Sequence, residues 1–194
     1  MKKYLTPILL AILILNSSIL CEKFECHELP NTKLGENRNW LPIQGRTSSQ
    51  FVTDNGSIRS FPISVNDTIL KVSSCYSSTF NEHESLKVEM LLDSIPSISK
   101  PEIISVQLDF ENQMTVTTKQ YTMDEQNYWL YSLKNVGNYQ GTTPLSNFQL
   151  KNRIYPTGVL LSSRYKDHVI DSIYLAKNFG IVGFKYQKVW YYLP

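Results

Sequence analysis

The chain has 194 residues and a nearly balanced charge, with 19 Lys and Arg against 17 Asp and Glu and a net charge of +2. Its basic residues are scattered, whereas nucleic-acid-binding proteins usually cluster them on one face, and we therefore expect no nucleic-acid partner. The length suits one ordinary domain. Twelve Tyr, eight Phe and three Trp favour β-strands over helices.

The first twenty residues have the pattern of an export signal. Met1-Lys2-Lys3 is positively charged, an apolar run follows over residues 4–15, and polar residues interrupt it at 16–18. This run is shorter than the roughly 20 apolar residues of a membrane-spanning helix. We therefore predict a helical signal peptide over residues 1–20 and a location in the cell envelope.

Cys21 follows this signal directly, and the arrangement resembles a bacterial lipoprotein signal. In such signals the cysteine is acylated and becomes the mature N-terminus. Leu20 departs from the pattern, because Gly, Ala or Ser usually precedes the cysteine. The resemblance implies lipidation of Cys21 and a membrane as a partner through this anchor. Cleavage by an ordinary signal peptidase would instead yield a periplasmic or secreted domain.

Two further cysteines, Cys26 and Cys75, remain once Cys21 is assigned to lipid. In an oxidising compartment they can form a disulfide that closes a loop of about 50 residues and stabilises the fold by roughly 2–4 kcal/mol. The alternative is that both remain free thiols, because spacing in the sequence does not show whether their Cα atoms are close enough.

Residues 21–47 are predicted to be a tether and a docking loop, because they are polar except for Trp40-Leu41 and Ile43. A single β domain is predicted over residues 48–194. Its first hairpin turns at Asp54-Asn55-Gly56, where Asn-Gly supplies the positive φ angles of a tight turn.

Further strands are predicted from alternation of apolar and polar residues. A second turn is expected at Asn66-Asp67, before a third strand over 68–73. Later strands are expected over the following ranges: Leu86–Leu92, Ile104–Phe110, Met114–Thr118, Tyr128–Tyr131 (a strand or a short helix), Gly158–Ser163, 169–176, 180–184 and 189–193. The predicted fold is mainly β, an antiparallel meander that forms a curved sheet, a half-barrel or a sandwich.

The last predicted strands carry a second resemblance. The segment from Tyr174 through Ala176-Lys177 to Phe184, with a late Trp190 and an early Trp40-Leu41-Pro42, is similar to segments of small uncharacterised secreted lipoproteins of Bacteroidetes-type bacteria. The resemblance covers about a third of the chain. It implies an envelope location and a curved antiparallel sheet, and it brings no assigned activity.

No catalytic or metal-binding residue is predicted, and no cofactor. His83 is flanked by Glu82 and Glu84, but in an extended chain those carboxylates would face away from it, and we expect a solvated loop there. His27 lies close to the mature N-terminus. His168 could join one of many serines in a hydrolase site, but no Gly-x-Ser-x-Gly motif is present.

Aromatic residues offer a candidate binding face, because exposed rings on a sheet can stack on sugars or line an apolar groove. The candidates are Trp129, Tyr131, Tyr139, Tyr155, Tyr165, Trp190 and Tyr192, with Tyr191 beside them. The alternative is that these rings pack in the core and across strands.

The leading functional prediction is a non-enzymatic binding or structural module of the envelope. A buried aromatic set without a cavity would favour a protein partner or a structural role. A deep apolar pocket would favour a carrier of a small apolar ligand or lipid. An envelope hydrolase is the third hypothesis, and it requires a histidine near a carboxylate and a serine in a cleft.

Overall fold

A computed structural model of the chain describes residues 31–42, 45–73, 80–92, 102–109, 113–119, 126–133, 141–163 and 169–194. The predicted signal peptide and the three cysteines lie outside these residues. The chain divides into two compact units, residues 1–30 with 72–81 and residues 31–71 with 82–194. The features described below lie in the second unit, except that residues 72–73 and 80–81, at the ends of two strands, belong to the first.

This unit is mainly β, as the sequence predicted. A short 3-10 helix, η1 (Gly35–Trp40), precedes the strands. The strands are β1 (Ser48–Thr53), β2 (Ile58–Ser73), β3 (Phe80–Leu91), β4 (Ile103–Leu108), β5 (Gln113–Lys119), β6 (Gln126–Ser132), β7 (Thr142–Leu150), β8 (Arg153–Ser162), β9 (Ile170–Ala176), β10 (Gly180–Tyr186) and β11 (Val189–Tyr192). Among the described residues, no helix has the length and apolar character needed to cross a membrane.

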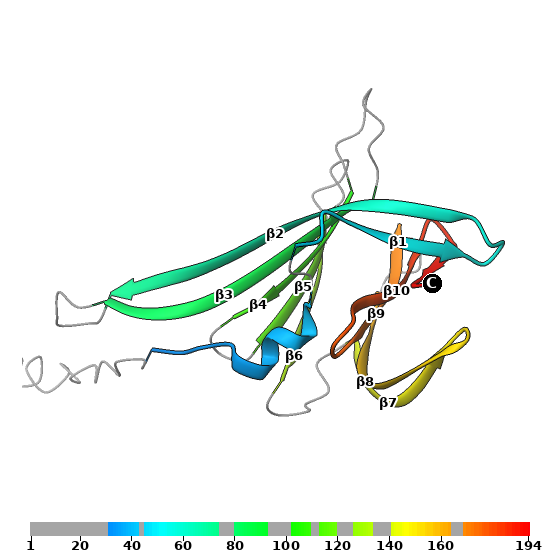
Figure 1. Ribbon diagram of the computed structural model, residues 1–194. Helices are drawn as coiled ribbons and strands as arrows, with labels where there is room; N and C mark the ends of the chain where they lie inside the picture. Colours follow the sequence, from blue (N-terminus) through cyan, green and yellow to red (C-terminus); the bar gives the residue numbers. More distant parts are fainter. Residues whose placement is uncertain are drawn as a thin grey trace, which may run out of the picture. The chain divides into compact units, whose positions relative to one another are not determined.

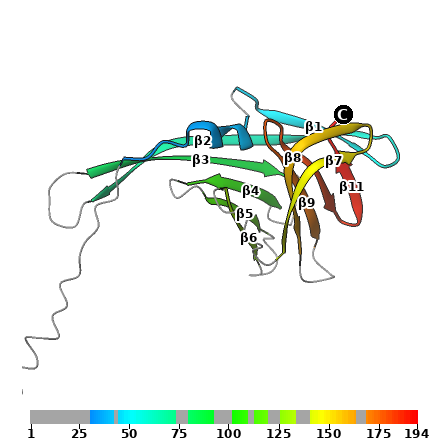
Figure 2. The same ribbon diagram turned by 90° about the horizontal axis from the view of Figure 1, so that it is seen from below.

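All eleven strands belong to one sheet in the order β6-β5-β4-β3-β2-β1-β11-β10-β9-β8-β7. Strands adjacent in sequence are neighbours throughout, which is a meander, and β1 joins β11 through Val52 opposite Tyr192 and Thr53 opposite Tyr191. The sheet curls until its edge strands β6 and β7 contact each other, as Figures 1 and 2 show. The result is a nearly closed barrel built from one continuous sheet rather than a sandwich of two.

The closure between the sheet edges depends on Trp129 and Gly141. The indole N–H of Trp129 on β6 donates a hydrogen bond to the carbonyl oxygen of Ser162 at 3.0 Å. Gly141, just before β7, has a φ of +82°, and a Cβ there would lie 2.8 Å from the same carbonyl oxygen and 3.2 Å from the indole nitrogen. Any side chain at this position would strain the backbone and separate the edges.

The core fills the interior of the curled sheet, because alternate residues of each strand point inward. On β4 and β5, Ile104, Val106 and Met114 have no measurable exposure. Nearer β1 and β10, the Phe51 ring meets Phe61 and Phe184 edge to face, with centroids 5.8 and 5.0 Å apart. Edge-to-face contacts are a favoured geometry of aromatic pairs, so this cluster holds strands β1 and β2 against β10.

The segment before β1 packs on the same core. Leu34, Trp40 and Leu41 are buried, and the Trp40 ring meets Tyr131 edge to face at 6.0 Å. The described part of the predicted docking loop, residues 31–42 and 45–47, therefore belongs to the same compact unit as the strands.

One predicted turn is wrong. Asn66 and Asp67 lie inside β2, which continues without a break through residues 68–73, so the predicted third strand is the second half of β2. Asn and Asp favour turns because their side chains can bond nearby backbone groups. Here the Asp67 carboxylate instead pairs with Arg38, at 2.8 Å, and this ion pair lowers the pKa of Asp67.

Strand β7 and the first half of β8 were not predicted. Residues 142–150 read Thr-Thr-Pro-Leu-Ser-Asn-Phe-Gln-Leu, and their burial shows no clean alternation. Asn147 has a positive φ of 47° and lies opposite Pro156, which has no backbone N–H to donate. The register is the same on both sides of this position, with Ser146 opposite Thr157 and Phe148 opposite Tyr155. At Tyr128–Tyr131, where a strand or a helix was predicted, the structure forms strand β6.

Candidate functional site

The predicted aromatic binding face divides between two sides of the sheet. Trp129 and Tyr131 on β6 belong to the interior core, with 4% and 5% of their surface exposed. Tyr191 also points inward and stacks on Phe184 with centroids 5.0 Å apart. These rings pack as core residues, which was the alternative prediction. Tyr139 and Tyr165 lie outside the described residues.

The remaining three candidates, Tyr155, Trp190 and Tyr192, lie on the outer face. They form part of a continuous aromatic series, here called the outer aromatic layer, whose members are Phe148, Tyr155, Tyr174, Phe179, Trp190 and Tyr192. Successive centroids are 5.1 Å apart for Phe179 and Tyr155, 5.2 Å for Tyr155 and Phe148, 6.1 Å for Phe148 and Tyr174, and 5.7 Å for both Tyr174 with Trp190 and Trp190 with Tyr192.

This layer exists because the β7–β8 hairpin lies against the outer face of β9 and β10. Phe148 packs directly on Gly158, where a Cβ would lie 2.4 Å from its ring. Tyr155, with 1% exposure, forms a second small core with Ala176 and Val182. Burial raises the pKa of the Tyr155 hydroxyl, and a hydrogen bond from Arg153 acts in the opposite direction. Phe148, Tyr174 and Phe179 were not among the predicted candidates, because they come from three different places, β7, β9 and the turn between β9 and β10, and only the fold brings them together.

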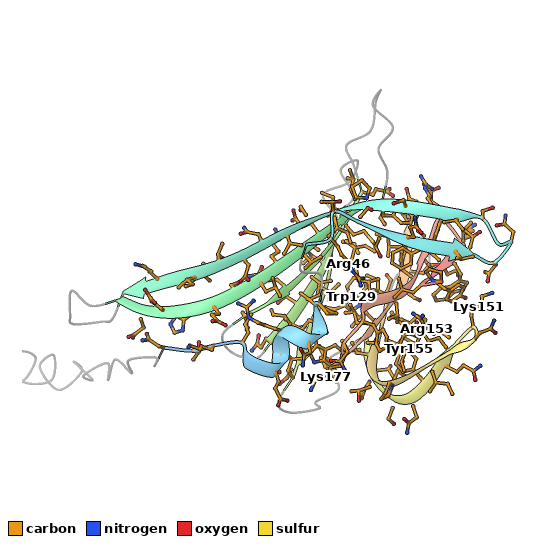
Figure 3. All side chains as sticks on the ribbon, viewed as in Figure 1. Arg46, Trp129, Lys151, Arg153, Tyr155 and Lys177 are labelled. Carbon is orange, nitrogen blue, oxygen red and sulfur yellow. The ribbon has the colours of Figure 1, made fainter. Side chains whose placement is uncertain are left out.

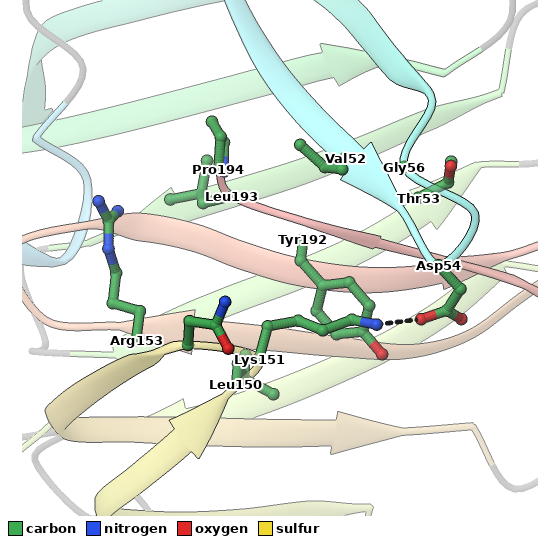
Figure 4. A pocket seen from close by; sticks show the side chains of 11 residues that line it. Val52, Thr53, Asp54, Gly56, Leu150, Lys151, Arg153, Tyr192, Leu193 and Pro194 are labelled. Carbon is green, nitrogen blue, oxygen red and sulfur yellow. Dashed lines mark hydrogen bonds and ion pairs between the residues drawn. The ribbon is translucent and has the colours of Figure 1, made fainter.

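Two adjoining cavities lie beside the tip of this hairpin, and together they are called the outer cleft. The Lys151 cavity, of about 490 Å³, lies between Val52, Lys151 and Tyr192 (Figure 4). The Arg46 cavity, of about 680 Å³, lies between residues 46–50 and Phe179. Arg153, Leu193 and Pro194 line both cavities, so the two adjoin each other. Figure 3 labels Arg46 near the beginning of β1, and Lys151 and Arg153 beside the β7–β8 hairpin.

Two residues that line the Lys151 cavity, Lys151 and Asp54, form an ion pair. The Lys151 Nζ lies 2.6 Å from Oδ1 of Asp54, in the β1–β2 turn, and 4.9 Å from the centre of the Tyr192 ring. The hydrogen bond with Asp54 raises the pKa of Lys151, and burial raises the pKa of Tyr192. The Lys151 ammonium and the Asp54 carboxylate carry opposite charges, and their ion pair holds the tips of the β1–β2 and β7–β8 hairpins together.

The Arg46 cavity forms where β11 stops. β11 has only four residues and ends at Tyr192, while β1 begins at Ser48. β1 pairs with β11 only at Val52 and Thr53, so the described residues supply no strand partner for residues 48–51 on this edge. A gap in the sheet results, and the side chains around it are polar and cationic: Arg46, Ser48, Ser49, Gln50, Arg153 and Asn178.

The described histidine lies away from the cleft. His83 is on strand β3 and fully buried, so the predicted solvated loop is wrong. Its Nδ1 lies 2.9 Å from Oγ1 of Thr32, which bridges to β3 in parallel. Its neighbour Glu84 accepts a hydrogen bond from the backbone N–H of Leu34.

No group of three or more His, Cys, Asp or Glu in the described part of the chain is placed to hold a metal ion. His27 and His168 lie outside it.

The fold and cleft define a small protein of one meander sheet with a second apolar layer on part of its outer face. Comparison of the chain with known protein families, with curated proteins and with solved structures finds no match. Functional evidence therefore comes from the residues that line the outer cleft.

Proposed function

We propose that the protein is an exported, lipid-anchored envelope protein that acts as a non-enzymatic binding module and holds its ligand in the outer cleft. The observation that carries the binding part is the pair of adjoining cavities, of about 490 and 680 Å³, beside the β7–β8 hairpin. Small-molecule sites typically occupy roughly 300–1,000 Å³. Each cavity is large enough for a small molecule, and both together suit an extended one.

Export and anchoring are supported by the sequence alone. The charged start, the short apolar run and Cys21 form a signal of lipoprotein type, and acyl chains would hold the protein at a membrane. The proposed disulfide between Cys26 and Cys75 belongs to the same oxidising compartment. The likeness to secreted lipoproteins of Bacteroidetes-type bacteria stays a prediction.

The alternatives receive less support from the cleft. A carrier of a purely apolar ligand would need apolar walls, but Lys151, Arg153 and Asp54 line the cleft. Sugar stacking would need free ring faces, whereas Tyr192 lies between Trp190 and Lys151. A hydrolase would need a histidine near the cleft, and the residues described as lining it include none.

Mass spectrometry of the mature protein extracted from its native envelope tests both parts. Acylation should add a lipid-sized mass at Cys21, and a Cys26–Cys75 bond should appear as a loss of two hydrogens that a reductant reverses. Under native conditions the protein should also carry a small molecule. An unacylated mature chain would contradict the anchor.

A cleft-filling variant locates the bound molecule. Ser48 is exposed and lines the Arg46 cavity, so Ser48→Trp should displace the molecule while the fold persists. Ser60 is exposed on the neighbouring strand and outside the cavity lining, so Ser60→Trp is the matched control and should retain it. Retention by Ser48→Trp would contradict binding in the outer cleft.

A further inference from the structure

We propose that the ligand of the outer cleft carries an oxyanion, a phosphate or a carboxylate, joined to an apolar group, and that Arg46 and Arg153 bind the oxyanion. This inference rests on the proposed binding function and names the chemical class of its ligand. Three properties of the Arg46 cavity support it: two arginines without an Asp or Glu side chain in the described lining, hydrogen-bond donors around them, and an apolar wall beside the donors.

The two arginines give the cavity positive charge, and no Asp or Glu side chain of its described lining pairs with them. Arg46 and Arg153 are both exposed and line the same cavity, and no Asp or Glu is among the described residues of its lining. Within the described part of the chain, neither arginine has a carboxylate within 4.0 Å. Lys151, in contrast, already pairs with Asp54. A guanidinium binds carboxylate and phosphate through two parallel hydrogen bonds, so these are the groups the cavity suits best.

Neutral donors surround the two arginines. Ser48, Gln50 and Asn178 line the cavity with hydroxyl and amide groups. The edge of β1 over residues 48–51 adds backbone groups that have no strand partner there among the described residues. An oxyanion has several lone pairs to satisfy, and this set of donors can satisfy them. Arg153 is also oriented by its hydrogen bond with the Tyr155 hydroxyl.

The apolar part of the ligand has a surface beside these donors. Phe179 and Leu193 line the Arg46 cavity. Arg46, Ser49 and Phe179 also border a smaller cavity of about 20 Å³ whose other walls include Met90 and Ile181. That volume holds about one water-sized group, and a methionine side chain can rearrange to enlarge such a space. A ligand with its oxyanion at the arginines can therefore direct an apolar group toward the core.

Binding of short soluble amphiphiles tests the inference. Isothermal titration of the full mature chain should show hexyl phosphate or hexanoate binding at least about 10-fold more tightly than inorganic phosphate, hexanol or hexyltrimethylammonium, a difference of about 1.4 kcal/mol. The double variant Arg46→Gln with Arg153→Gln should lose at least about 10-fold in affinity for the anionic amphiphile.

A second double variant controls for net charge. Lys33 and Lys188 are exposed and lie outside both cavities. Lys33→Gln with Lys188→Gln therefore removes the same charge and should leave the affinity within about 2-fold, because neither lysine can bind an oxyanion held in the cavity and salt screens charges at the surface. Equal losses in both double variants, or an unchanged affinity in the arginine variant, would overturn the assignment. Thermal melting of each variant shows whether it is folded.

The source of the oxyanion is distinguished by vesicles. If the ligand is a lipid headgroup, vesicles of phosphatidylglycerol should bind the chain through Arg46 and Arg153, and vesicles of phosphatidylcholine should not. If the ligand is a free molecule, only the soluble amphiphile should bind. Binding of hexanol as tight as that of hexyl phosphate, abolished by Ser48→Trp, would refute the oxyanion but keep the cleft as a site. Absence of binding by every probe would refute the oxyanion inference, and the proposed function would then depend on the native mass spectrum.

Discussion

The two halves of the sheet differ in how many of their faces are buried. On β4 and β5, inward residues such as Val106 and Val116 are fully buried, while their neighbours Gln107 and Thr115 are half-exposed. On β10, every residue from 180 to 184 is buried. The first half therefore has one apolar face and one polar face, whereas the second half is covered on both.

The difference locates the candidate site. A strand buried on both faces needs a second layer to cover it, and here the layer is the chain's own β7–β8 hairpin. The hairpin covers β9 and β10 only in part, and the outer cleft lies where its tip meets β1 and β11. Two-sided burial thus indicates where a sheet can form a cavity on its outer side.

The largest expected effect comes from removing the centre of this second layer. Tyr155→Ala should lower the free energy of unfolding by about 3–5 kcal/mol, the usual cost of truncating a buried aromatic residue, although Tyr155 is on the outer face. Chemical denaturation measures this change. Thr115→Ala, on the outer face of β5, is the comparison and should stay within about 0.5 kcal/mol. Similar losses at both positions would mean that the two halves do not differ.

An intermediate effect is expected where the hairpin approaches the sheet most closely. At Gly158 a Cβ would lie 2.4 Å from the Phe148 ring and 2.5 Å from the carbonyl oxygen of Leu175. Gly158→Val should therefore destabilise the protein by about 1–3 kcal/mol through overpacking. Thr157→Val, at an exposed neighbouring position, should be nearly neutral in the same denaturation experiment. A stable Gly158→Val protein would show that Phe148 does not pack on this glycine.

The smallest effect is expected from the ion pair at the hairpin tip. Lys151→Gln should lower the melting temperature by only about 1–2 °C, because exposed ion pairs are weak. Since Asp54 raises the pKa of Lys151, the contribution of the pair is fully present below the ordinary lysine value of 10.5 and is lost as the pH rises through the raised value. The difference between Lys151→Gln and the unmodified protein should accordingly vanish at high pH. A difference that persists there would show that Lys151 acts through packing on Tyr192 rather than through its charge.

Local signals predicted much of the sheet. The β1–β2 turn was identified from Asn55-Gly56, and Gly56 has the positive φ of 84° that the turn requires. Alternation predicted β3, β4 and β5. Asn66-Asp67 misled the prediction because a turn preference is weak beside the pairing of a long strand. β7 was missed because the burial of its residues does not alternate, so apolar and polar residues do not alternate along it either.

The candidate site could be predicted only in part. Tyr155, Trp190 and Tyr192 were recognised as candidates from residue type, but Trp129 and Tyr131 have the same residue types and lie in the interior. Which side of a sheet a ring faces depends on strand register. Arg46 and Arg153 were not recognised, because more than 100 residues separate them and neither belongs to a motif.

The sequence by itself determined that the chain forms antiparallel strands joined by short turns, since two-residue alternation and turn residues act over a few positions. Only the tertiary structure decided that β11 stops short beside β1, that the β7–β8 hairpin covers the outer face, and that two distant arginines share one cavity. These features follow from the packing of strands far apart in the chain, and no local pattern encodes that packing.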